Sequence, residues 1–354
     1  MKIGILTFHC AYNFGALLQA YALQETLALE GHDVDIIDYR PDYLATKKPP
    51  FSLRNILTRN PANIFKKIRR TLNRRDYFFK FRRFEKEYFK KRGIAEPSHY
   101  DAVIIGSDQI WNKEYNRRDE IWYGKLPPAI TADRIITYAA SAGDATDRQI
   151  DGERLNANLS GFSKILVRET CLKDRLRDSF GIESEKVIDP VLLAPSQVWE
   201  KWRMERPGRK YVLVYQPRQH DNILKTALKI ADYIGDCDVV AVAWYPEKGT
   251  PGVKSVNVSP KGFVEYVKNA ECVLTSSYHG TAVSIATETP FFTILLGDGK
   301  DARSADLLAE LGLEDHGIPV KDIPKVGNCD FGRARGLLAK YREESFKELR
   351  EALK

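Results

Sequence analysis

The chain has no close pairs of cysteines and no cluster of residues with metal-ligand spacing. A zinc site needs such pairs, and a disulfide framework needs an even set. The five cysteines are odd in number and widely scattered: Cys10, Cys171, Cys237, Cys272 and Cys329. We therefore expect reduced core thiols and no metal site.

Long apolar runs are also missing. Nothing approaches the roughly twenty consecutive apolar residues of a membrane-spanning helix. The opening stretch MKIGIL has too short an apolar run for a signal peptide, and it carries no small-residue cleavage site. These observations favour a cytoplasmic protein.

A dinucleotide-binding fingerprint is absent from the first βαβ pattern. Residues 2–7 and 34–38 read as strands and residues 17–27 as a helix, but the loop between them lacks G-x-G-x-x-G. The loop does hold Asn13 and Gly15. Ligand binding at this loop and a plain tight turn both remain open.

What the sequence does contain is two consecutive halves in which strands and helices alternate. Its 354 residues, 43% hydrophobic and 29% charged, suffice for two globular domains. The expected strands lie at residues 2–7, 34–38, 100–105, 135–139 and 162–167, and then at 211–215, 238–243, 253–256, 272–274 and 291–295. This pattern predicts an α/β fold with two Rossmann-like domains facing each other across a cleft.

We place the N-terminal domain at residues 1–195 and the C-terminal domain at 196–330. The first includes a basic, aromatic helical insertion at about 52–95, and the last helix, 331–354, is amphipathic and could pack back on the N-terminal domain. From Arg54 to Arg92 there are fifteen Lys or Arg residues against three acids. This segment is either a solvated helix with core-facing aromatics or a surface for anionic lipid head groups or a lipid-linked diphosphate. Nucleic-acid binding is the third interpretation, but no recognised nucleic-acid motif accompanies the charge.

The densest set of polar groups lies in residues 275–286, TSSYHGTAVSIA, between an expected strand and an expected helix. Such turns lie at the carboxyl ends of parallel strands, where ligands bind, and helix starts favour anions. Here His279 either binds a ligand or caps its own turn. Gly280 would let the backbone approach a ligand.

Two further strand ends carry polar groups. The string GSDQIWN at 106–112 places Asp108, Gln109, Trp111 and Asn112 after a buried strand, which suggests a polar pocket or, alternatively, a helix start capped by Asp108. Arg168 follows the strand at 162–167. It suits bidentate capture of a carboxylate or phosphate, and a structural contact with Glu169 is the alternative.

Several stretches together resemble the polysaccharide pyruvyl transferase family. They are NFGALLQAY from Asn13, IGSDQIWN from Ile105, VRE from Val167, DPVLL from Asp189, SYHGTA from Ser277 and RSADLL from Arg303. The resemblance covers about residues 2–315. It implies a fold similar to two-domain glycosyltransferases and transfer of pyruvate from phosphoenolpyruvate onto a hexose of a polysaccharide or lipid-linked precursor, giving a cyclic ketal. Phosphoenolpyruvate would be a co-substrate, and no cofactor is expected.

By this resemblance His279 is the functional histidine, with Asp108 as a second catalytic candidate. The donor-binding candidates are Arg168, Arg218, Arg303, Ser277, Gly280 and Thr281. The acceptor-binding candidates are Asn13, Gln109, Trp111, Asn112 and Tyr278. The family pattern has Arg-Leu before the histidine, where this chain has Ser277 and Tyr278, so Arg218, Lys300 or Arg303 would have to replace the missing arginine.

Two other functions fit the same fold. A nucleotide-sugar glycosyltransferase would bind a nucleoside diphosphate, and a non-catalytic glycan-binding homologue would have lost the chemistry with the missing arginine. Fold alone does not separate these classes. For the enzyme we expect phosphoenolpyruvate and a saccharide as partners, peripheral contact with the inner membrane face through the basic segment, and no nucleic acid.

Overall fold

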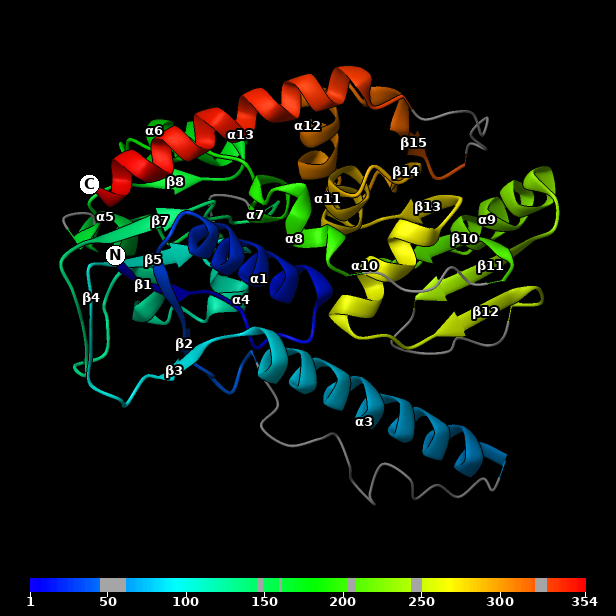
Figure 1. Cartoon of the computed structure of the whole chain (residues 1–354), viewed down its shortest axis with the longest axis horizontal. Coiled ribbons are helices and arrows are strands. Elements are labelled where there is room, and N and C mark those ends of the chain that lie inside the picture. The colour runs from blue at the N-terminus through cyan, green and yellow to red at the C-terminus, as the bar shows by residue number, and fades with distance from the viewer. Residues whose placement is uncertain (45–61, 145–148, 159–160, 203–207, 243–249, 322–329) are drawn as a thin grey trace.

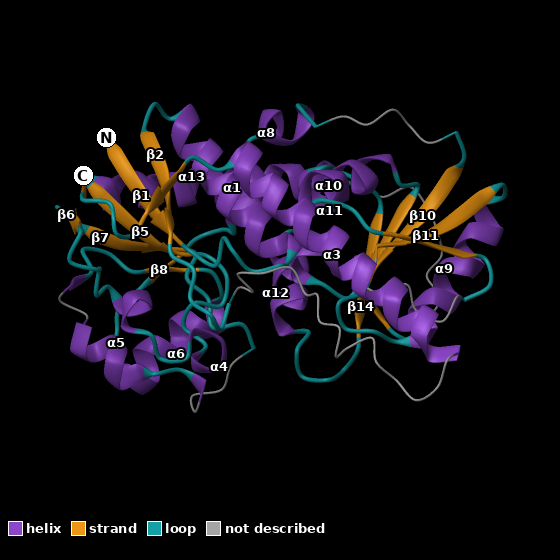
Figure 2. Cartoon of the chain, turned by 90° about the horizontal axis from the view of Figure 1, so that it is seen from below, coloured by secondary structure: helices purple, strands orange, loops and turns teal. Residues whose placement is uncertain are grey.

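A computed structural model of the chain describes residues 1–44, 62–144, 149–158, 161–202, 208–242, 250–321 and 330–354. Its two parallel sheets lie at opposite ends of the molecule, with helices between them (Figures 1 and 2). Within each of the two sheets, every pair of neighbouring strands is parallel. The predicted α/β class with two Rossmann-like halves is confirmed.

The first sheet has the strand order β3-β2-β1-β5-β7. Its strands are β1 (Lys2–Leu6), β2 (Asp33–Asp38), β3 (Lys91–Gly93), β5 (Ala102–Gly106) and β7 (Ile135–Tyr138). β5 is buried at every residue, as expected of a parallel strand covered on both faces. The order reverses between β1 and β5, so polar groups that follow these two strands meet at one edge.

The second sheet has the order β12-β11-β10-β13-β14-β15. Its strands are β10 (Lys210–Tyr215), β11 (Cys237–Val242), β12 (Val253–Val256), β13 (Cys272–Thr275), β14 (Phe291–Leu295) and β15 (Gly317–Pro319). Here the order reverses between β10 and β13. That switch point lies next to the 275–286 segment.

Shorter elements complete the two halves. Two-stranded parallel pairs join β4 (Ser98–Tyr100) to β6 (Ile130–Ala132) and β8 (Leu166–Val167) to β9 (Glu185–Lys186). The strand expected at 162–167 is therefore confined to its last two residues. The helices are α1 (Phe14–Leu29), α4 (Lys113–Asn116), η1 (Glu120–Tyr123), α5 (Gly152–Asn158), α6 (Thr170–Phe180), α7 (Pro190–Leu193), α8 (Ser196–Glu200), α9 (Asp221–Ile234), α10 (Pro260–Asn269), α11 (Tyr278–Ala286), α12 (Ala302–Glu310) and η4 (Glu314–His316).

Two long helices, α3 (Ala62–Tyr88) and α13 (Gly332–Leu353), lie on opposite sides of the molecule (Figure 1). α13 follows the second sheet and runs back along the first half, where Arg134 donates to the Leu353 carbonyl and Ser345 accepts from the Ile188 amide. α3 turns Tyr77, Phe78, Phe81 and Phe84 into the core. Those aromatics thus have the core-facing role that was one of the interpretations of the basic segment.

The expectation that the cysteines are core thiols holds only in part. Cys171 is exposed, so it is not a core thiol, whereas Cys10 and Cys272 are buried and Cys329 lies outside the described residues. Within the described ranges, no helix is both long enough and apolar enough to cross a bilayer.

Candidate active site

His279 enters the structure on the first turn of α11, directly after β13. Ser277 caps this helix by accepting a hydrogen bond from the Gly280 amide at 3.3 Å. Gly280 has a local reason to be glycine, because a Cβ there would lie 2.2 Å from the Thr275 hydroxyl oxygen. Its role is thus close packing of helix on strand, which does not require the expected donor contact.

The imidazole of His279 is wedged between the two domains. A Cβ built on Gly15, in the first turn of α1, would lie 2.1 Å from Nδ1 of His279, so only glycine leaves room for the ring. On the other side, Nε2 lies 3.5 Å from Oδ2 of Asp189. His279 is 9% exposed, and its Nε2 has no hydrogen-bond partner among the described residues. A buried imidazole nitrogen beside a carboxylate can accept a proton and hold it as imidazolium.

Asp189 is the site residue that our sequence-based candidates omitted. It caps α7 by accepting from the Val191 amide at 2.9 Å, and it accepts from Arg168 Nη1 at 2.8 Å. Burial would raise the pKa of this carboxyl, but His279 and Arg168 outweigh it and hold the pKa well below the ordinary value. Asp189 is therefore a buried anion. The Asp-Pro pair that begins α7 signals a helix cap, which does not reveal the contact with His279.

Arg168 is fully engaged by the protein. It donates from Nε to Glu169 at 2.8 Å, from Nη1 to Asp189 and from Nη2 to Ser141 at 2.9 Å. Burial would lower its pKa, but Glu169, Tyr278 and Asp189 raise it well above the ordinary value. The alternative interpretation, a structural contact with Glu169, describes what is observed. In this structure Arg168 positions Asp189 and Tyr278.

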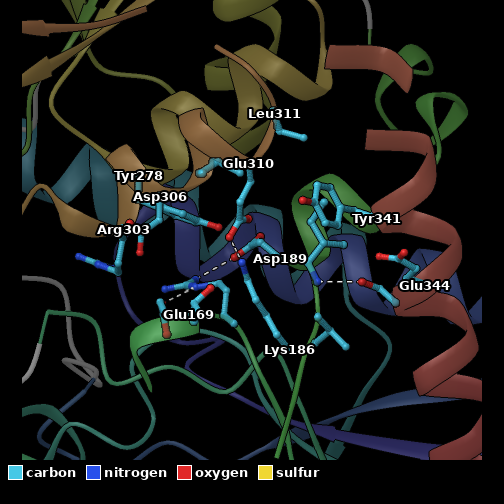
Figure 3. Close-up of a pocket in the computed structure, with 16 residues that line it drawn as sticks. Glu169, Lys186, Asp189, Tyr278, Arg303, Asp306, Glu310, Leu311, Tyr341 and Glu344 are labelled. Carbon is cyan, nitrogen blue, oxygen red and sulfur yellow. Dashed lines mark hydrogen bonds and ion pairs between the residues drawn. The ribbon is translucent and has the colours of Figure 1, made fainter. Parts of the chain in front are cut away.

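Tyr278 lies close to two arginines, of which Arg303 is labelled in the close-up (Figure 3). The guanidinium carbon of Arg168 is 4.5 Å from the centre of the Tyr278 ring and that of Arg303 is 5.9 Å away. Burial and Asp189 raise the pKa of the phenol, so Tyr278 is neutral at physiological pH. The ring therefore joins Arg303 of the second half to Arg168 of the first through cation–π contacts.

The other two predicted donor arginines are half-buried and paired with carboxylates. Arg303 contacts Asp144 of the first half at 3.0 Å, and Arg218 contacts Asp298 and Asp301 at 2.6 Å each. Unlike the Arg168 contacts, these pairs reach solvent. An incoming carboxylate or phosphate could therefore exchange with them at a lower desolvation cost.

A cavity of about 190 Å³ lies between Arg168, α12 and α13 (Figure 3). Within it Lys186 pairs with Glu310, and burial lowers the pKa of this lysine. Its charged lining comprises three cations, Arg168, Lys186 and Arg303, and five carboxylates, Glu169, Asp189, Asp306, Glu310 and Glu344. Carboxylates thus outnumber cations in this lining.

Asp108 lies in a conformationally restricted turn after β5. Gly106, Ser107 and Asp108 have φ values of 155°, 32° and 56°, and a Cβ on Gly106 would lie 2.2 Å from the Tyr138 carbonyl oxygen. Left-handed non-glycine residues often mark functional sites. The charge of Asp108 acts on Arg168. Asp108 therefore lies in the electrostatic neighbourhood of the Arg168–Asp189 pair.

Three residues expected to contact ligands are buried and form hydrogen bonds within the protein. Trp111 is fully buried and its Nε1 donates to the Trp122 carbonyl, so its ring offers no face to a sugar. Asn112 is buried as the cap of α4 and donates to the Ala142 carbonyl. Thr281 is fully buried and bonds to Thr293 at 2.7 Å.

Of the two remaining acceptor candidates, Asn13 lies beside residues of the second half, whereas Gln109 contacts Gly143 of its own half. The Asn13 side chain caps α1 by accepting from the Gly15 amide at 2.8 Å. Gln109 packs against Gly143: a Cβ added to Gly143 would lie 2.3 Å from the side-chain oxygen of Gln109. In the part of the chain that the structure describes, no group of three or more His, Cys, Asp or Glu residues could hold a metal ion.

The two parallel sheets define a two-domain α/β protein. Its candidate site lies between the domains, where a histidine, a buried carboxylate and several arginines meet. The sequence profile of the polysaccharide pyruvyl transferase family matches residues 13–297. The chain therefore belongs to this family of transferases.

Solved structures of similar shape include the UDP-GlcNAc 2-epimerase of Methanocaldococcus jannaschii, at 15% identity, with 97% of this chain and 92% of that one covered and a TM-score of 0.46. The Streptomyces sp. SF2575 glycosyltransferase SsfS6, complexed with thymidine diphosphate, is 14% identical, with 99% of each chain covered and a TM-score of 0.47. The E. coli heptosyltransferase WaaC is 13% identical, with 98% and 99% covered and a TM-score of 0.41. At these values the likeness is one of fold alone. No curated protein sequence matches the chain.

Proposed function

We propose that the chain transfers the pyruvate unit of phosphoenolpyruvate onto two hydroxyls of one hexose, in a polysaccharide or a lipid-linked precursor, with release of phosphate. Family membership supports pyruvyl transfer. The observation that carries the proposal is the placement of the His279 imidazole between Gly15 and the buried Asp189 carboxylate.

The reaction needs a proton donor and a proton acceptor. A sugar hydroxyl oxygen bonds to the enol carbon, the hydroxyl loses its proton, and the methylene carbon gains one and becomes methyl. The second hydroxyl then bonds to the same carbon while the carbon–oxygen bond to phosphate breaks. Its proton passes to the departing phosphate, which gives the ketal and inorganic phosphate. A histidine can serve either proton step near neutral pH, and we assign this role to His279.

Asp189 would stabilise the imidazolium form of His279. Its carboxylate is kept ionised by Arg168 and lies 3.5 Å from Nε2, so a proton arriving on the ring gains a buried counter-charge. The positive charge that develops on the enol carbon would benefit from the same anion. Asp108 is our candidate base toward the sugar hydroxyl.

The donor anion would be held by Arg303 and Arg218, assisted by Ser277 at the start of α11. Both guanidinium groups are presently paired with exchangeable carboxylates. Arginine suits phosphoenolpyruvate because its planar fork matches both the carboxylate and the phosphate. These two residues would replace the arginine that the family pattern has at the position of Ser277. Tyr278 fixes Arg303 from one side.

The exposed face of α3 supports a lipid-linked acceptor. Leu72 and Phe79 are 55% and 48% exposed, and Arg75 lies 5.6 Å from the Phe79 ring centre. Exposed apolar side chains among arginines suit the interface of an anionic membrane. We propose that α3 brings the enzyme to the cytoplasmic membrane surface, and that phosphoenolpyruvate acts as co-substrate without a cofactor or metal.

The test is phosphate release from phosphoenolpyruvate in the presence of a panel of methyl hexosides, with the product examined for a ketal carbon by NMR. We expect release only when both substrates are present, loss of release in His279→Ala, and full release in the exposed control His99→Ala. Equal release by His279→Ala would refute the assigned role. Consumption of a nucleotide sugar with phosphoenolpyruvate untouched would instead make the protein a glycosyltransferase.

A further inference from the structure

A second pocket, of about 260 Å³, lies where the ends of β10, β11 and β12 face the start of α1 and the helix α3. We call it the tyrosine pocket. The lining residues that matter here are three tyrosines and three amides: Tyr12, Tyr77, Tyr215, Asn13, Gln216 and Gln219. Only Asn13 was among the ligand-binding residues expected from the sequence.

The described residues that line the tyrosine pocket carry no charged side chain, since none of them is an Asp, Glu, Lys, Arg or His. An anion would therefore lack a counter-charge, and so would a cation, whereas a neutral polar ligand would find partners. The amides of Asn, Gln and the hydroxyls of Ser255 and Thr250 can both donate and accept, as sugar hydroxyls do.

The floor of the tyrosine pocket is built from rings that hold one another in place. Phe14 stacks on Phe263 at 4.7 Å and meets Tyr215 and Tyr77 edge-on at 5.5 and 6.0 Å. Tyr77 also donates to the Tyr12 carbonyl at 3.2 Å. Because these residues come from α1, α3, β10 and α10, the floor is preorganised by both halves of the chain. A rigid aromatic floor suits the apolar face of a sugar ring.

Two lining residues connect the tyrosine pocket to the segments that hold His279. Asn13 lies two residues before Gly15, and a Cβ on Gly15 would lie 2.1 Å from Nδ1 of His279. Tyr215 forms a hydrogen bond with Ser277 that partly offsets the rise in the pKa of Tyr215 caused by burial. Ser277 caps the helix that carries His279. The pocket and the residue assigned to proton transfer are thus linked through residues 13–15 and through Ser277.

We infer that the tyrosine pocket binds an uncharged pyranose unit and is the acceptor subsite of the transfer. The assignment as an acceptor subsite rests on the proposed function. The binding of a saccharide in this pocket does not depend on that function. The charged donor then lies with Arg303 and Arg218, so the two substrates occupy chemically distinct places.

The test uses methyl galactopyranoside and methyl glucopyranoside as probes and saturation-transfer NMR on the full chain. Gln219→Glu places a charge in the pocket and Ser255→Trp fills it from the exposed edge of β12. Gln197→Glu, exposed on α8 and outside the pocket, is the matched control. We expect both pocket variants to raise the Kd for at least one of the two hexosides about tenfold or more. The control should bind both hexosides as the wild type does.

Equal binding by wild type and both pocket variants would overturn the inference. Tighter binding of uridine than of either hexoside, lost in Gln219→Glu, would do so too, since the pocket would then take a nucleobase. The donor is tested separately. If phosphoenolpyruvate is not used but hexoside binding depends on Gln219, the proposed function fails and the sugar site stands. If phosphate is released and Gln219→Glu leaves the acceptor KM unchanged, the site fails and the function stands.

Discussion

Nε2 of His279 lies 3.5 Å from Oδ2 of Asp189, and the two residues come from opposite halves of the chain. Asp189 is held there by Arg168, which donates to the same oxygen at 2.8 Å. The catalytic histidine of the proposed reaction therefore depends on a carboxylate that only the assembled two-domain fold supplies.

Replacing Asp189 by Asn should affect stability and catalysis together. The pKa of Asp189 is held below its ordinary value of 3.8, so its stabilising contribution is complete above that pH and is lost as the pH falls below it. We expect Asp189→Asn to lower the free energy of unfolding at pH 7 by about 3 kcal/mol, with a smaller deficit at pH 3. Urea unfolding at both pH values measures this. The control is Asp174→Asn, at a side chain that is 49% exposed.

The same variant should also slow turnover. Without the carboxylate, an imidazolium formed on His279 during the proposed reaction loses its counter-charge, so we expect kcat to fall at a temperature where the variant is fully folded. A purely structural role for Asp189 would leave the kcat of the folded variant unchanged.

Gly15→Ala should impair catalysis through one methyl group. Its Cβ would lie 2.1 Å from Nδ1 of His279, so the ring must move. We expect turnover to fall about a hundredfold, the order of loss seen when a catalytic group is displaced. Gly336→Ala is the matched control, since nothing lies within 4 Å of its Cβ on α13, and the substitution should stabilise the helix by up to about 1 kcal/mol. Unchanged turnover in Gly15→Ala would argue against the position assigned to His279.

Substitutions of Arg303 and of Asp144 should affect the KM for phosphoenolpyruvate differently. We expect Arg303→Ala to raise the KM for phosphoenolpyruvate about tenfold or more, whereas Asp144→Asn removes a competing carboxylate 3.0 Å away and should not raise it. Initial rates over a range of donor concentrations measure both. The exposed Arg335, paired with Glu288, supplies the control Arg335→Ala. A rise in KM for Asp144→Asn equal to that for Arg303→Ala would mean that the pair merely holds the domains together.

Charge reversal on α3 should weaken membrane binding. Arg75 and Arg83 are exposed on this helix, close to Phe79 in sequence. The double variant Arg75→Glu, Arg83→Glu should lose most of its sedimentation with anionic phospholipid vesicles while it retains activity on a soluble methyl hexoside. The surface control is Arg177→Glu. Equal loss of activity on soluble and lipid-linked acceptors would indicate a structural role for α3.

Much of the fold follows from local patterns. Apolar runs such as residues 102–105 and 272–274 are short and lie between turn residues, so they predict buried parallel strands, and the alternation with helices predicts the two halves. The helix expected at about 222–234 is observed as Asp221–Ile234. These features depend on sequence neighbours only.

The site could be predicted only in part, because its contacts join distant segments. The sequence predicts His279 at a strand end, and the structure has it directly after β13. Asp189 was not predicted, since its partners Arg168 and His279 reach it only through the packing of β8, α7 and α11. The burial of Trp111 could not be predicted, because an indole after a strand fits both a sugar platform and the core; its hydrogen bond to the Trp122 carbonyl appears only in the fold.

The most direct test of the account is the shift in melting midpoint caused by phosphoenolpyruvate and, separately, by UDP-galactose and GDP-mannose. A ligand that binds only the folded state must raise the midpoint. The account predicts a rise with phosphoenolpyruvate that is reduced in Arg303→Ala, and no rise with either nucleotide sugar. A rise with a nucleotide sugar and none with phosphoenolpyruvate would contradict it.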